Sequence, residues 1–144
     1  MSQQLDQVDL EILKFLKKDA RTPFTEIGKR LGISDATVHV RVKKMLKAGI
    51  IKGYTVRIDE RAIGRRVTGY VLMTVKQGKV EEVSRKLARM ESITTVQEVH
   101  GSNNILIKIG ASDVSMLRDI VMKVQRIPGV INSECFMVLK TWKE

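Results

Sequence analysis

The chain has 144 residues, of which 43% are hydrophobic and 29% are charged, and its formal net charge is +10. This composition is typical of a folded globular protein with room for one ordinary or two small domains, and it excludes an intrinsically disordered chain. No apolar run approaches the roughly 18 residues of a membrane-spanning helix, and the acidic N-terminus lacks a signal-peptide pattern, so we expect a cytoplasmic protein without membrane partners.

Basic residues are concentrated in the first part of the chain. Residues 1–66 hold 15 Lys and Arg against 8 Asp and Glu, whereas residues 67–144 hold 11 against 8. Such an excess attracts phosphate backbones through counterion release, and it would serve an anionic membrane surface equally well. Charge alone therefore leaves both kinds of partner open.

Two segments of helical periodicity come first. The first segment, residues 5–20, carries Asp6 and Asp9 in its first turn, where the helix dipole favours acids. A second, shorter helix is predicted from Pro23 to Leu31, with Thr22 as its N-cap and Gly32 ending it. The apolar positions that predict these helices are Leu5, Ile12, Leu13, Leu16 and Ala20 in the first and Phe24, Ile27 and Leu31 in the second.

Residues 34–48 predict a third helix with two different faces. Ser34 can cap its N-terminus, and Gly49 ends it. At 100° per residue its apolar side consists of Val38, Val42, Met45 and Leu46. The opposite side holds Ala36, Thr37, Val40, Lys43 and Lys44, with His39 and Arg41 on the flanks. One face is therefore suited to a core and the other to a groove.

The turn Gly32-Ile33 joins the second and third predicted helices tightly. Two helices linked by a short turn with glycine, the second one basic on its free side, form the helix-turn-helix arrangement that binds double-stranded DNA. The alternative is a three-helix bundle with a solvated basic face. We predict that Arg41 reads a base and that the lysines contact phosphates. The predicted DNA-binding residues are Ser34, Asp35, Thr37, His39, Arg41, Lys43 and Lys44.

Residues 50–59 alternate apolar and polar side chains, which predicts the strand, or wing, of a winged helix-turn-helix module. Residues 60–66 lose this alternation and carry three arginines, as a basic linker near DNA phosphates would. The predicted organisation is a DNA-binding domain over residues 1–59, a linker over 60–66 and a second domain over 67–144.

The second domain alternates strand and helix patterns in the order βαββαβ. The predicted strands are residues 68–76, 94–100, 105–110 and 130–142, and the predicted helices are residues 79–90 and 113–127. This order predicts a ferredoxin-like antiparallel sheet with both helices on one face, and it makes the whole chain α+β.

Two of these strands are apolar on both faces. Val71, Leu72 and Met73 follow one another, as do the apolar residues 136–139. Because two helices cover only one face of such a sheet, something else must cover the other face. A second copy of the chain covers it symmetrically, so we expect at least a homodimer.

With these features the chain resembles the Lrp/AsnC family, the leucine-responsive, feast/famine regulators. The resemblance covers nearly the whole chain, and it implies transcriptional control by a winged helix-turn-helix joined to an amino-acid-responsive ferredoxin-like domain, in dimers that assemble further to octamers. The matching residues are Leu5-Asp6, Asp9, Ile12-Leu13, Arg21, residues 31–34, Val38, Arg41, Val42, residues 49–54 and Pro128-Gly129-Val130.

The family's effector loop reads Gly-x-Tyr-Asp between the second and third strands of this domain, and here residues 101–104 read Gly-Ser-Asn-Asn. Replacing the family's Asp with Asn removes a negative charge, which favours a neutral polar effector such as glutamine or asparagine. The alternative is that both asparagines are hairpin residues that tolerate positive φ, and both roles can hold together. The predicted effector-binding residues are Glu98, Val99, His100, Gly101, Ser102, Asn103, Asn104 and Arg118.

The sequence holds no Gly-rich phosphate loop and no nucleophile elbow. His39 and His100 lack neighbouring ligand residues, and Cys135 is predicted to be a small core residue in an apolar strand. We therefore expect no metal, no cofactor and no enzymatic activity. The predicted function is a sequence-specific DNA-binding transcriptional regulator that responds to a small amino acid. An effector-independent architectural DNA-packing protein is the alternative, ahead of an enzyme on a ferredoxin-like fold.

Overall fold

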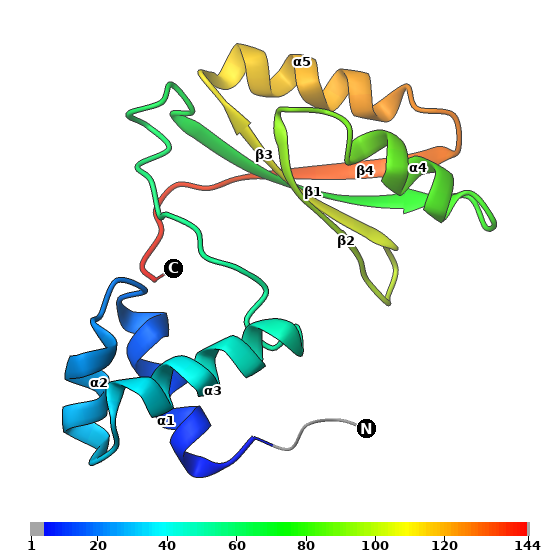
Figure 1. The fold of residues 1–144 in the computed structure, drawn as a ribbon. Coiled ribbons are helices and arrows are strands. Elements are labelled where there is room, and N and C mark those ends of the chain that lie inside the picture. The colour runs from blue at the N-terminus through cyan, green and yellow to red at the C-terminus, as the bar shows by residue number, and fades with distance from the viewer. Residues whose placement is uncertain (1–4, 144) are drawn as a thin grey trace. The chain divides into compact units, whose positions relative to one another are not determined.

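The structure, a computed structural model, describes residues 5–143. The chain divides into two compact units, Met1–Arg57 and Ile58–Glu144. The first unit contains helices, and the second contains a sheet with two helices (Figure 1). The division at residue 57 falls two residues before the predicted end of the DNA-binding domain.

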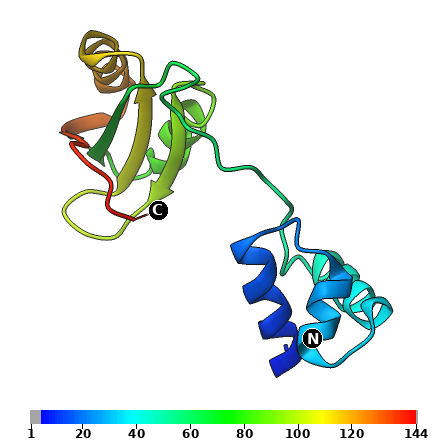
Figure 2. The ribbon, with the colours of Figure 1, turned by 90° about the vertical axis from the view of Figure 1, so that its left-hand side faces the viewer.

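The first unit is built from three helices packed around one another (Figures 1 and 2). They are α1 (Gln7–Lys18), α2 (Phe24–Leu31) and α3 (Asp35–Lys47). Leu46 was predicted to be inward but is 38% exposed, because positions 38, 42 and 45 already fill the narrow buried stripe of α3. Ala20 is also exposed, since α1 ends before it. The buried core residues are Ile12, Leu16, Ile27, Val38, Val42 and Met45.

The helix starts are fixed by side chains close in sequence. Asp6 and Asp9 form a capping box on α1, in which Asp6 accepts from the Asp9 amide at 2.8 Å. Ser34 accepts from the Thr37 amide at 3.1 Å and caps α3, as predicted. The N-cap predicted at Thr22 is wrong, because Pro23 occupies that position and the Thr22 hydroxyl donates to the Asp19 carbonyl instead.

The turn between α2 and α3 depends on two glycines. Gly32 has φ +68°, a left-handed conformation that ends α2 at little steric cost. Gly28 lies buried inside α2, where its carbonyl accepts from the Ile33 amide at 3.0 Å. A Cβ at Gly28 would lie 2.6 Å from the Ile33 carbonyl oxygen, so only glycine lets the chain turn this closely.

The strand predicted for residues 50–59 is not formed. The described chain has no regular structure from residue 52 to 58, and the apolar members of the alternating pattern, Tyr54, Val56 and Ile58, are exposed. An alternating segment becomes a strand only when another strand satisfies its backbone groups, and no described strand pairs with it.

The second unit has the predicted βαββαβ order and forms one antiparallel sheet with strand order β2-β3-β1-β4. Both helices contribute to one continuous core on the same sheet face. The predicted ferredoxin-like, α+β architecture is confirmed. The elements are β1 (Val67–Val75), α4 (Val80–Leu87), β2 (Ile93–Glu98), β3 (Ile105–Ala111), α5 (Val114–Gln125) and β4 (Val130–Met137).

The last strand, β4, is shorter than the predicted 130–142. Its neighbour β1 begins at Val67, and the Val138 amide already bonds to the Thr68 carbonyl at 2.9 Å. Within residues 5–143, no strand faces the segment 138–143, so the pattern of apolar residues cannot extend the ladder. Cys135, predicted to be a core residue, is exposed because β4 lies at the edge of the sheet.

The sheet face turned away from the helices carries large apolar side chains. Tyr70 pairs with Phe136 across β1 and β4, and Leu72 pairs with Leu106 across β1 and β3. Phe136 is 46% exposed, and Glu134 and Lys108 lie in the same rows. We call Tyr70, Leu72, Leu106 and Phe136 the outer sheet face; it is apolar at its centre with charges beside it.

Candidate functional site

The exposed side of α3 is the first candidate site. Its N-terminal polar residues are tied to the helix cap: the hydroxyls of Ser34 and Thr37 lie 2.8 Å apart, and Asp35 accepts from the Ala36 amide. His39 packs edge-to-face against Phe24 of α2, with 6.0 Å between ring centroids. All four side chains remain exposed, so each can still meet a ligand at this surface.

The two lysines predicted to contact phosphates, Lys43 and Lys44, are exposed on the second half of α3. Val40 and Ala36 are exposed one and two turns before Lys44, and Val40 is 50% exposed although it is apolar. The face therefore combines cationic groups with an uncharged centre, a combination suited to a DNA groove.

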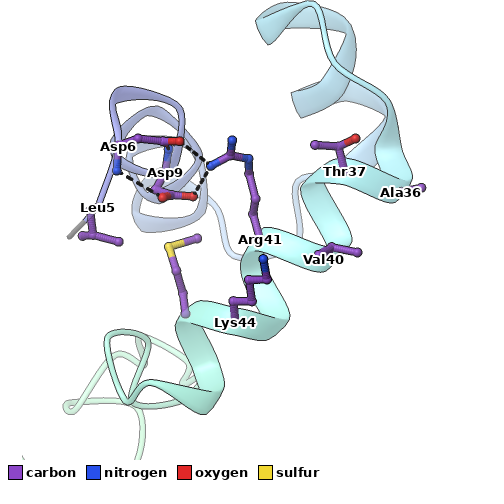
Figure 3. A pocket seen from close by; sticks show the side chains of 9 residues that line it. Leu5, Asp6, Asp9, Ala36, Thr37, Val40, Arg41 and Lys44 are labelled. Carbon is purple, nitrogen blue, oxygen red and sulfur yellow. Dashed lines mark hydrogen bonds and ion pairs between the residues drawn. The ribbon is translucent and has the colours of Figure 1, made fainter. Parts of the chain in front are cut away.

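Arg41, the residue predicted to read a base, is engaged by the first helix. Its Nη1 donates to Asp6 Oδ2 at 2.7 Å and to Asp9 Oδ1 at 2.9 Å, as Figure 3 shows. The Arg41 side chain is 29% exposed and that of Asp9 is 15% exposed. We call these three residues the Asp6–Arg41–Asp9 cluster. Its contacts tie α3 to the N-terminus of α1.

The cluster changes the acid–base properties of its members. Hydrogen bonds from the Asp9 amide and from Arg41 hold the pKa of Asp6 below its ordinary 3.8. The bonds to Asp9 and Asp6 in turn raise the pKa of Arg41. Because the folded pKa of Asp6 is depressed, its stabilising effect is present above pH 3.8 and is lost as the pH falls through the lower folded value.

Sequence reasoning missed the cluster because its members lie 32 and 35 residues apart. The available signal was the Asp6–Asp9 capping-box pair, two carboxylates at the start of the first helix in the part of the chain that carries the basic excess. Beside the cluster lies a recess of about 620 Å³ between α1 and α3. Figure 3 shows its walls, which include Leu5 from the start of the chain and Val40 and Lys44 from α3.

The second candidate site is the loop between β2 and β3. Glu98 ends β2, and the Val99 amide donates to the Asn104 carbonyl at 3.1 Å, which closes the loop. His100, Gly101 and Ser102 are exposed at its tip. The structure thus brings together seven of the eight predicted effector residues, as their adjacency in sequence requires.

The two asparagines of this loop are held by β1. The Asn104 side chain accepts from the Val75 amide at 2.8 Å and donates to the Val75 carbonyl at 2.9 Å. Asn103 Oδ1 accepts from the Thr74 hydroxyl at 3.1 Å. Neither asparagine has positive φ, so the predicted left-handed turn conformation is wrong. Both asparagines nevertheless have a structural role, because their side chains bond to β1. The Asn104 amide extends the β1–β3 ladder and is not a free ligand group.

Arg118, the eighth predicted effector residue, lies exposed on α5. The loop precedes β3 and α5 follows it, so the loop and the start of α5 lie at opposite ends of that strand (Figure 1). Within one chain Arg118 is therefore not assembled with residues 98–104.

Among residues 5–143, no group of three or more His, Cys, Asp or Glu side chains is arranged to hold a metal ion. None of the helices in the described part of the chain is long and apolar enough to cross a membrane.

Comparison with known proteins assigns each unit. Residues 5–52 match the family model described as winged helix-turn-helix DNA-binding, and residues 68–144 match the Lrp/AsnC ligand binding domain. The HTH-type transcriptional regulator FL11 of Pyrococcus horikoshii is 36% identical over 140 residues, covering 97% of this chain and 93% of that protein. The regulatory protein AsnC of Haemophilus influenzae is 35% identical over 138 residues, covering 94% and 92%.

A solved structure of E. coli AsnC superimposes with a TM-score of 0.91 at 28% identity, covering 99% of this chain and 97% of the other. The matches join a helix-turn-helix to a ligand-binding domain in the order found here. These relatives and domains are those of regulators, not enzymes. The chain belongs to the Lrp/AsnC family of DNA-binding transcriptional regulators.

Proposed function

We propose that this regulator binds specific double-stranded DNA sites by placing α3 in the major groove. The observation that carries the proposal is the exposed face of α3. Lys43 and Lys44 lie beside its uncharged centre, Ala36 and Val40, and Ser34 caps the start of the helix. Helix-turn-helix proteins read base edges with the first turns of this helix and neutralise phosphates with the residues around it. We also propose a cytoplasmic location, the compartment in which such a regulator would meet its DNA.

Lys44→Ala should weaken binding to cognate and random duplexes alike and lower the slope of log K against log salt by about one. Arg41→Ala should leave the ratio of cognate to random affinity nearly unchanged, because Asp6 and Asp9 already hold the guanidinium. Fluorescence anisotropy over a salt series measures both. A loss of about 1 to 3 kcal/mol confined to the cognate duplex would return Arg41 to a base-reading role.

We propose further that a small amino acid controls the protein through the loop at residues 98–104. The match of residues 68–144 to a ligand-binding domain supports this. The exposed tip presents small residues whose backbone amides can receive a carboxylate, and Glu98 can receive an ammonium group. Residues 99–104 carry no carboxylate, so we favour a neutral polar effector such as glutamine or asparagine.

We also propose that the chain works as a homodimer that assembles to an octamer. The outer sheet face supports this, since Phe136 and Tyr70 would otherwise leave a large apolar surface in water. A twofold dimer buries such a patch twice with one set of residues. Arg118, remote from the loop of its own chain, could then meet the loop of a neighbouring chain.

Gly101→Val should abolish stabilisation by the effector and leave effector-free DNA binding intact, because the recognition helix lies in the other unit. Thermal shift with each of the twenty amino acids measures the effect; a ligand at 100 times its Kd stabilises by about 2.7 kcal/mol. Gly78→Val is the matched control, since Gly78 also has positive φ and open space around its Cβ position.

Light scattering on the same samples reports assembly. Undiminished amino-acid binding by Gly101→Val would place the effector elsewhere. A parent protein that binds no amino acid would favour the architectural DNA-packing alternative, and a monomer at micromolar concentration with and without ligand would contradict the assembly proposal.

A further inference from the structure

The centre of the exposed α3 face, where base contacts are expected, consists of apolar side chains. Ala36 and Val40 lie one turn apart on this face, and Val40 is half exposed. Thr37 stands between them with its hydroxyl in contact with Ser34 Oγ at 2.8 Å. With the hydroxyl engaged in the helix cap, the methyl group is the part of Thr37 that remains for a ligand.

The Arg41 guanidinium, the polar group that would compete with these apolar side chains for a base, is bonded to α1 instead. A free arginine at position 41 would pair with the O6 and N7 acceptors of guanine. Here Asp6 and Asp9 hold its Nη1 at 2.7 and 2.9 Å. Figure 3 shows the Arg41 guanidinium turned toward these carboxylates of α1, while Ala36, Thr37 and Val40 line the same recess along α3. The two carboxylates also compensate its positive charge, which lowers its attraction for phosphate.

In the major groove only one base-pair type presents an apolar group. Thymine carries a C5-methyl, whereas guanine, cytosine and adenine present donors and acceptors. Methyl and β-branched side chains match that group, and the lysines beside them hold the phosphates.

We propose that Val40, with Ala36 and the Thr37 methyl, determines sequence specificity by packing against thymine C5-methyl groups in the major groove. The inference rests on the proposed placement of α3 in that groove. It assigns the preferred operator a thymine at the positions that face Val40. It also gives Asp6 and Asp9 a function beyond capping α1, since they keep Arg41 from imposing a guanine at the neighbouring position.

Replacing single thymines by deoxyuridine tests this, because that change removes the methyl group and keeps the base pair. Duplexes are first selected from a random pool by the full-length protein, and each thymine in the selected sites is then replaced in turn. At one or two positions the parent protein should lose about fourfold in affinity, the effect of one buried methyl-sized group. Val40→Ala should bind the thymine and uracil duplexes with nearly equal affinity at those positions.

Lys44→Ala is the control: it should weaken binding throughout and keep the thymine-to-uracil ratio. The Val40→Ala variant should fold, because Val40 is exposed and alanine has a higher helix propensity than valine. Selected sites with no uracil effect, or a ratio unchanged in Val40→Ala, would overturn the thymine inference while leaving sequence-specific binding in place. Failure to enrich any sequence would overturn sequence-specific binding and the thymine inference with it.

Discussion

Gly28→Ala should lower the free energy of unfolding of the first unit by about 3 kcal/mol, at the upper end of typical overpacking costs. The added Cβ would lie 2.6 Å from the backbone oxygen of Ile33, and a carbonyl inside a tight turn cannot move away as a side chain can. Alanine's better helix propensity, about 1 kcal/mol over glycine, offsets only part of this. A unit of this size has a stability of only about 3 to 8 kcal/mol, so the loss is large.

Urea unfolding followed by helical circular dichroism, with hydrogen exchange at α2 and α3, measures the effect. Gly49→Ala is the matched control within the same unit: nothing lies within 4 Å of its Cβ position, but its φ is +71°. It should cost about 1 to 2 kcal/mol from backbone strain alone. If Gly28→Ala were as stable as the parent, the close approach of α2 to the turn would not constrain the fold.

Asn104→Ala should destabilise the second unit by about 2 kcal/mol. The substitution removes the partner of both the amide and the carbonyl of Val75, at 2.8 and 2.9 Å, and leaves these two backbone groups unsatisfied at the end of β1. Losing such bonds at partly buried groups costs about 1 to 3 kcal/mol. The most direct measurement is hydrogen exchange of the Val75 amide, which should become markedly faster.

Asn103→Ala is a close control, because Asn103 is the same residue type in the same loop, and its side chain accepts a hydrogen bond from the Thr74 hydroxyl and not from a backbone amide of β1. It should cost less than about 1 kcal/mol and leave Val75 protected. Equal effects of the two substitutions would mean that Asn104 does not extend the ladder. Amino-acid binding measured on the Asn103 variant then tests the loop without disturbing the sheet.

Local features explain why much of the architecture is predictable. The caps at Asp6 and Ser34 act within three residues, and Gly32 ends α2 by its own conformation. Periodicity placed the three helices and the βαββαβ order because each buried face repeats along a single element. The N-cap predicted at Thr22 is wrong by one residue, since sequence patterns locate an element better than its boundaries. The prediction for Leu46 is wrong because periodicity indicates the buried side of a helix but not how wide the buried stripe is.

The sequence by itself determined the helix-turn-helix, the ferredoxin-like unit and the basic face of α3, since all of these follow from spacing within short segments. Tertiary structure alone decided three points. Arg41 lies against two carboxylates 32 and 35 residues away, and Asn104 bonds to Val75 at the end of β1. Residues 52–58 are part of no strand of the sheet in the described chain. The physical reason is the same in each case. A polar group's role depends on which partner the fold brings within hydrogen-bond distance, and residue order does not contain that distance.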